Sequence, residues 1–462
     1  MDKSSEQKQT LYNIIASVLI GGINFLTAPI FTRLLGTAQY GKFSVAYSWV
    51  TILTCFMGFQ TKEALATGIY DFREDYLRFR NSTLLLGTGI SIGLIALLSA
   101  FSGPIGRALG YSPVFLFLIL LTALTQYIWA FAQNTFIFEK KAQYNLLLSV
   151  FLVISIVALS IFFILYAPFE KYVGRMLGFT IPFAAFAFGC WIALFSRQPS
   201  GYHKTYWKYS LSFGFPIIFH ALSTVVLGQS DRVMMQLFHV QDSDIGVYSW
   251  YFGLISALIM VRDALNNSWR PFYYDGLNEN RCEPLNQKCG NLLELFTVIT
   301  CVFLLIVREV SLLMAGKEYQ RDLGVLLILV IGAYFTFVFQ FPVNFELYHK
   351  KTKIIATGTV SAAMANVLLN AVLIPRWGVY GAAAATSAAY LLLAMAHFLI
   401  ATHLRGIPYH LRLLSFLPGL IAITLGAVLF LILPQLWILR WLLAAVITAW
   451  ELIRILKRKS VF

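Results

Sequence analysis

The chain has 462 residues, of which 59% are hydrophobic and 12% are charged, and its formal net charge is +14 at pH 7. Runs without any Asp, Glu, Lys or Arg cover residues 108–138, 142–169, 176–196, 377–404 and 413–439. Each run exceeds the ~20 residues that a helix needs to cross the hydrocarbon layer of a membrane, which excludes a soluble protein. The positive charge fits basic loops that face anionic lipid, so no nucleic-acid partner is expected.

Fourteen membrane-spanning helices account for these runs and the interrupted ones. Every backbone amide in lipid needs a partner within its own segment, so apolar runs of this length can only be helices. The sequence therefore predicts an all-α polytopic membrane protein. A twelve-span arrangement stays open if two of the weaker helices are merged or misplaced. In chain order, the predicted spans are 11–31, 42–60, 82–101, 114–138, 146–166, 174–195, 209–237, 245–265, 291–314, 323–346, 354–374, 379–402, 412–433 and 436–456.

The basic residues gather in alternate loops. With the N-terminus inside, the inner loops and termini hold 24 of the 35 Lys and Arg residues, and the outer loops hold 9. Cytoplasmic loops carry such an excess, so both termini are expected to face the cytoplasm. The first apolar run has no small-residue cleavage site behind it, which indicates a retained helix rather than a signal peptide.

An internal repeat divides the chain into two lobes. The segment FAQNTFIFEKKAQYN at 131–145 aligns with FPVNFELYHKKTKII at 341–355 and shares a Phe, an Asn and the Lys-Lys pair. We expect six-helix lobes at 1–208 and 209–402, followed by a helix pair with a basic cytoplasmic tail at 403–462. Lobes that enter the membrane in the same direction around a central cavity are typical of carriers with parallel repeats. The longest loops are predicted at about 61–81 and 269–290, both on the cytoplasmic side.

Three segments resemble polysaccharide flippases of the Wzx type: GINFLTAPIFTRLLGTAQYG at 22–41, GQSDRVMMQLF at 228–238 and NVLLNAVLIPRWGVYGAAAATSAAYLL at 366–392. These flippases share a superfamily with the multidrug MATE exporters and the lipid II flippases, in which two six-helix bundles surround a cavity. Fourteen spans are more similar to the lipid II flippases than to the twelve often drawn for Wzx proteins, which leaves the role of the last helix pair open.

The resemblance implies a transporter rather than an enzyme, without a cofactor or metal. Its substrate would be an undecaprenyl-pyrophosphate-linked oligosaccharide repeat unit, moved by alternating access across the bacterial cytoplasmic membrane for surface polysaccharide synthesis. A glycan polymerase is a further candidate partner, and a monomer is expected. An unpaired hydroxyl in hydrocarbon costs several kcal/mol, so the sugars need a polar cavity while the lipid tail stays in the bilayer.

Charged residues within spans are the first candidates for substrate contact, because each is costly unless it faces a cavity or a partner. Arg232 is the leading candidate for the pyrophosphate or an acidic sugar, since a guanidinium matches two phosphate oxygens. Its neighbour Asp231 points about 100° away on the helix. Arg33 and Lys42 occupy the equivalent outer end of the first lobe. An interfacial anchor is the alternative for all three basic residues.

Two further charged pairs are predicted at gates or between lobes, namely Arg262 with Asp263 at the inner end of the eighth span and Arg308 with Glu309 near the outer end of the ninth. Neutral polar residues form a second set that can exchange hydrogen bonds with hydroxyls, with interhelix bonding as the alternative. The substrate candidates in this set are Asn24, Gln229, Asn134 and Asn344, and the others are Gln126, Gln133, His220, Gln340, Asn366 and Asn370.

Two other function classes stay open. One is a MATE-like, ion-coupled exporter of small cations. Such exporters resemble one another in having a carboxylate within the first helix of a lobe. Helix one has none between Asp2 and Glu63, although Asp231 lies in the corresponding helix of the second lobe. A membrane glycosyltransferase or glycan polymerase needs acidic residues in a sizeable outer loop, and the outer loops offer only scattered acids. No Walker-type phosphate loop is present, which argues against ATP hydrolysis.

Overall fold

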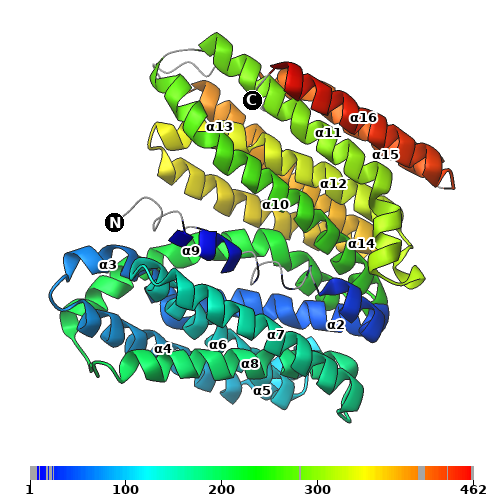
Figure 1. Ribbon diagram of the computed structural model, residues 1–462. Helices are drawn as coiled ribbons and strands as arrows, with labels where there is room; N and C mark the ends of the chain where they lie inside the picture. The colour runs from blue at the N-terminus through cyan, green and yellow to red at the C-terminus, as the bar shows by residue number, and fades with distance from the viewer. Residues whose placement is uncertain are drawn as a thin grey trace. The chain divides into compact units, whose positions relative to one another are not determined.

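The computed structural model describes residues 8–9, 11–16, 19, 23, 25, 27–279, 282–403, 411–433 and 435–458, with the side chains of 282–284 excepted. These residues form helices and no strand (Figure 1). The α-helices are Ala28–Phe56 (α2), Leu65–Asp71 (α3), Tyr76–Ala100 (α4), Ser102–Leu109 (α5), Pro113–Phe138 (α6), Ala142–Tyr166 (α7), Lys171–Phe195 (α8), Lys204–Leu237 (α9), Asp242–Asn278 (α10), Cys282–Met314 (α11), Leu323–Val338 (α12), Gln340–Tyr348 (α13), Thr352–His403 (α14), Leu417–Ile432 (α15) and Trp437–Arg458 (α16). Short 3-10 turns occupy Met57–Ala64 (η1), Lys317–Tyr319 (η2) and Leu413–Phe416 (η3).

The predicted fold class is confirmed. Within the described part of the chain, 11 helical stretches are long and apolar enough to cross a membrane. One of them, Thr352–His403, covers two predicted spans, and α16 matches the fourteenth prediction without being among the 11. The predicted span 11–31 lies partly outside the described residues.

Two glycines make the turns that the sequence presents as short loops. Gly36 interrupts α2 with φ 69° and ψ 173°, and Gly378 interrupts α14 with φ 53° and ψ −128°. Both values lie where a Cβ is disfavoured, so glycine is the residue that can change the helix direction within one position. The predicted outer turns at these two places are therefore single-residue interruptions of a helix, at Gly36 and at Gly378.

The two longest predicted loops are wrong in part. In place of loop 61–81 the chain forms the end of η1, all of α3 and the start of α4. In place of loop 269–290, α10 continues to Asn278 and α11 begins at Cys282. Polar, charged segments such as these lack the apolar signal of a span but still form helix when an adjoining helix nucleates them.

The chain forms two compact units, Met1–Gly246 and Val247–Phe462. In the first, α8 packs against both α6 and α7 around a core that includes Tyr127 and Trp129. In the second, α12 packs on α14, and α11 packs on α15 and α16. The predicted lobe boundary at 208/209 stays a prediction.

The internal repeat has a structural counterpart in two matching turns. Lys140 follows α6 with φ 57°, and Lys350 follows α13 with φ 58°. The next amide closes each turn, from Lys141 to the Phe136 carbonyl at 2.7 Å and from Lys351 to the Glu346 carbonyl at 2.8 Å. Left-handed residues with such bonds satisfy the last carbonyls of a helix. The aligned Lys-Lys pairs thus adopt the same backbone conformation.

Candidate functional site

Arg232 lies buried on α9 in a chain of polar contacts that reaches α2. Its Nη1 donates to the Gly228 carbonyl at 2.8 Å and to Gln229 Oε1 at 3.3 Å. The same Gln229 oxygen accepts a hydrogen bond from Ser48 Oγ on α2 at 2.9 Å. Arg232 is only 6% exposed. In this conformation its guanidinium therefore faces protein groups rather than an open cavity.

The same face of α2 makes a second, closer approach to the start of α10. A Cβ placed on Gly41 would lie 1.9 Å from the Asp242 carbonyl oxygen, and one placed on Gly246 would lie 2.0 Å from the Thr37 carbonyl oxygen. Real Cβ atoms do not come this close to backbone, so the two glycines permit the contact. Together with the Ser48–Gln229 bond, they close α2 against the α9–α10 corner.

A cavity of about 460 Å³ opens beside this contact and combines basic, acidic and aromatic side chains, including Lys42, Arg107, His239, Tyr111 and Asp242. Lys42 Nζ pairs with Glu170 at 2.7 Å. This bond from Lys42, followed by one from Gln39, lowers the pKa of the Glu170 carboxyl below its usual value. The cavity can therefore hold a polar or anionic group, although Glu170 already engages the Lys42 charge.

The remaining predicted substrate residues of this unit are dispersed. Asp231 is fully buried on α9 and Arg33 is exposed on α2. Asn134 on α6 donates to the Lys62 carbonyl at 3.4 Å. Asn24 lies outside the described residues.

An interrupted helix follows α2 and was not predicted from the sequence. In η1, Gly58, Phe59 and Gln60 have φ values of 59°, 47° and 54°. The side-chain amide of Gln60 donates to the Cys55 carbonyl at 2.9 Å, and the hydroxyls of Thr61 and Tyr127 share a hydrogen bond at 2.7 Å. Non-glycine residues in this conformation are strained and cluster at functional sites. In transporters, backbone unwinds where it lines a cavity.

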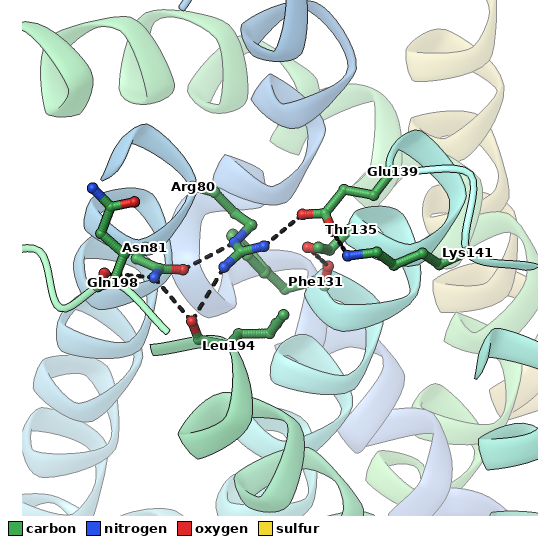
Figure 2. Close-up of polar contacts among 8 residues, drawn as sticks. All are labelled: Arg80, Asn81, Phe131, Thr135, Glu139, Lys141, Leu194 and Gln198. Atoms are coloured by element: carbon green, nitrogen blue, oxygen red, sulfur yellow. Dashed lines mark hydrogen bonds and ion pairs between the residues drawn. The ribbon is translucent and has the colours of Figure 1, made fainter. Parts of the chain in front are cut away.

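A buried polar cluster ties α4 to the ends of α6 and α8 (Figure 2). The Arg80 guanidinium contacts the Glu139 carboxylate and also donates to the Leu194 carbonyl at 3.1 Å. Asn81 donates to the Leu194 and Gln198 carbonyls at 2.9 and 2.7 Å, and Lys141 contacts the second Glu139 oxygen. Arg80 is 1% exposed, so its charge is compensated entirely within the protein.

In the second unit, the predicted residues make local contacts. Asn344 donates to Asn266 at 2.7 Å. Arg262 pairs with Asp263 at 2.7 Å, since a long Arg side chain can bend back to its neighbour. Glu309 on α11 contacts Arg440 on α16, whose Nη1 donates to the Leu305 carbonyl at 2.9 Å.

The other gate candidate of the ninth span, Arg308, also lies on α11. Two asparagines of α14 bond one another, with Asn370 donating to Asn366 at 3.1 Å. The gate and interlobe roles of all these residues stay predictions.

Sequence reasoning missed the buried pair between Glu346 on α13 and His397 on α14. Their Oε2 and Nδ1 atoms lie 2.8 Å apart, and both side chains are buried. An acid and an imidazole within predicted spans were visible signals, but their separation of 51 positions in the sequence concealed the partnership. Among the described residues, no group of three His, Cys, Asp or Glu side chains could hold a metal ion.

Residues 7–269 match the family described as "Polysaccharide biosynthesis protein". A Haemophilus influenzae protein named "Uncharacterized membrane protein" is 25% identical over 354 residues, covering 74% of this chain and 84% of that protein.

Solved structures of MATE transporters share the fold. An inward-facing multidrug resistance MATE family transporter of the MOP superfamily matches with a TM-score of 0.61, at 14% identity over 90% of this chain and 95% of that one. An outward-facing structure of such a transporter matches with a TM-score of 0.57, at 13% identity over 91% of this chain and 96% of that one.

The family match covers more than half of the chain, and it agrees with the Wzx-type segments and the transporter fold. The chain therefore belongs to the polysaccharide biosynthesis protein family and is a multi-pass membrane protein with the fold of the MATE transporters.

Proposed function

We propose that this protein moves undecaprenyl-pyrophosphate-linked oligosaccharide repeat units from the inner to the outer leaflet of the bacterial cytoplasmic membrane. Family membership over residues 7–269 is the observation that carries the proposal. The excess of basic residues in alternate loops supports an orientation with both termini in the cytoplasm. A glycan polymerase would consume the product, and the transporter would act as a monomer.

Polar side chains within the helices of the first unit support a hydrated route for sugars. Gln126, Gln133, Asn134 and Gln229 lie on α6 and α9, and each is partly exposed. An amide can donate to and accept from hydroxyls without the cost of a buried charge. These residues can therefore exchange their present partners for the hydroxyls of a passing oligosaccharide.

Arg232 would bind the pyrophosphate in a different conformation. Its guanidinium is buried and bonds Gln229, the residue that also accepts from Ser48 of α2. Separation of α2 from α9 would break the Ser48 bond and give the guanidinium room to bind two phosphate oxygens. Ser48 and Gln229 would part at the same step. Alternating access then links opening of this contact to phosphate binding, and closing of the contact to release.

Reconstituted liposomes test the proposal. A fluorescent undecaprenyl-pyrophosphate oligosaccharide is added with an external glycosidase, and protection of the sugar is followed in time. Protection that exceeds the level in empty liposomes is expected for the native protein and for Arg73→Gln, a control at an exposed cytoplasmic-side residue. Cation efflux with no sugar protection across several glycans would refute the flippase and favour an exporter.

A further inference from the structure

A groove runs along α8 between α6 and α7, apart from the contacts discussed for transport. Its volume is about 470 Å³. Small residues recur every four positions on one face of α8, at Ala185, Gly189 and Ala193, and form its floor. Side chains of Phe136 on α6 and of Leu148 on α7 form the walls. The interior is therefore apolar and open on one side.

Two basic side chains stand where the groove meets the end of the helices. Lys141 and Arg197 both line it. Lys141 shares the Glu139 carboxylate with Arg80 (Figure 2). Arg197 is exposed and has no hydrogen bond or ion pair with the described residues. The sequence assigns both residues to cytoplasmic loops, so the charged end of the groove lies at the inner leaflet.

The charges at this end sum to a cationic surface. Arg80 is buried and bonds Glu139, Asn81 and the Leu194 carbonyl, so it compensates the carboxylate from inside. Lys141, which also pairs with Glu139, and the exposed Arg197 add two positive charges to this compensated pair and line the groove. An apolar groove with a cationic end matches a lipid that has an acyl chain and a negatively charged phosphate.

We propose that this groove binds an anionic glycerophospholipid of the inner leaflet, with the acyl chain over Gly189 and the phosphate between Arg197 and Lys141. A guanidinium without a protein partner gains most from a phosphate oxygen. Because Lys141 already shares its charge with Glu139, the site suits a singly charged phosphodiester better than a pyrophosphate. The site does not depend on the flippase proposal.

Native mass spectrometry of the detergent-purified full chain tests the site. The protein is titrated with dioleoyl-phosphatidylglycerol and with dioleoyl-phosphatidylcholine, which carry the same chains. We expect the anionic lipid to be retained more strongly, by about fivefold or more for two basic residues near a lipid surface. Equal retention of the two lipids would overturn the proposal.

Variants test binding of the lipid phosphate and binding of its acyl chain separately. Arg197→Gln should bring retention of the two lipids close to equal. Gly189→Leu should weaken both, because a Cβ there meets open space and the longer side chain fills the groove without straining α8. Arg73→Gln removes the same charge outside the groove and should change nothing. An equal effect of Arg73→Gln would reduce the preference to general surface charge and refute the site.

Competition distinguishes the sources of phosphate. Millimolar inorganic phosphate should not displace the anionic phospholipid, because it lacks the chain, and displacement would overturn the lipid assignment. Undecaprenyl pyrophosphate should also leave it in place. If that lipid displaces phosphatidylglycerol one for one, the groove belongs to the substrate and the phospholipid proposal fails. Flipping by Gly189→Leu liposomes, measured in parallel, reports on the transport proposal separately.

Discussion

The close approach between α2 and the start of α10 predicts that Gly41→Ala opens this contact. The added Cβ would lie 1.9 Å from the Asp242 carbonyl oxygen and 2.9 Å from the Gly246 nitrogen. Both atoms belong to backbone and cannot rotate away, so the helices must separate. Overpacking of this kind costs about 1–3 kcal/mol. If the contact forms and breaks during transport, that cost shifts the population toward the separated state by about 5- to 150-fold.

Cysteine labelling measures the shift. In a background without the five native cysteines, Ser48→Cys places a thiol at the contact between α2 and α9, where the native side chain is buried. A membrane-impermeant maleimide added from outside should label it faster in the Gly41→Ala protein. Gly228→Ala is the matched control, because a Cβ at Gly228 meets nothing within 4 Å. Equal labelling rates in the two variants would show that the glycine contact does not govern access.

Three further predictions concern charged groups. Arg232→Ala should abolish flipping without preventing membrane insertion, and Arg232→Lys should retain part of it; normal flipping by the alanine variant would leave only an anchoring role. Glu139→Ala should lower the free energy of unfolding by about 3–5 kcal/mol, because Arg80 is left buried without its carboxylate partner. Thermal unfolding in detergent measures this loss. Replacing Arg80 and Glu139 together by Met should recover most of it. Lys42 holds the pKa of the Glu170 carboxyl below its usual 4.5. The pair should therefore stabilise the protein at neutral pH and lose this effect as the pH falls through the lowered pKa. The melting temperatures of the native protein and of Glu170→Gln should then converge in acid.

The spans could be predicted because the bilayer imposes a strong local rule. A run of about 20 apolar residues has few alternatives to a helix in lipid, and α6, α7 and α8 agree with their predicted spans within a few residues. The longest predicted loops failed for the complementary reason. Outside the apolar core, hydropathy carries no information on helix continuation, so the extension of α10 to Asn278 was missed.

Individual site residues could be nominated but not paired. A charge within a span signals a constraint, and this singled out Arg232 and Glu309. Their partners depend on which helices adjoin. Glu309 meets Arg440 across 131 residues, and Arg80 meets Glu139 across 59. A hydropathy pattern scores each buried charge by itself, whereas in the folded protein an opposite charge from another helix compensates it.

By itself, the sequence determined that this protein is a helical membrane protein of a polysaccharide biosynthesis family, because apolar length and short family segments are local properties of the chain. Only the tertiary structure decided that Arg232 is buried and bonds Gln229, which in turn accepts from Ser48 of α2. It also decided that Gly41 and Gly246 bring backbones into contact, and that small residues of α8 leave a groove beside Arg197. These features arise from the packing of distant side chains, which depends on shape and distance rather than on residue type along the chain.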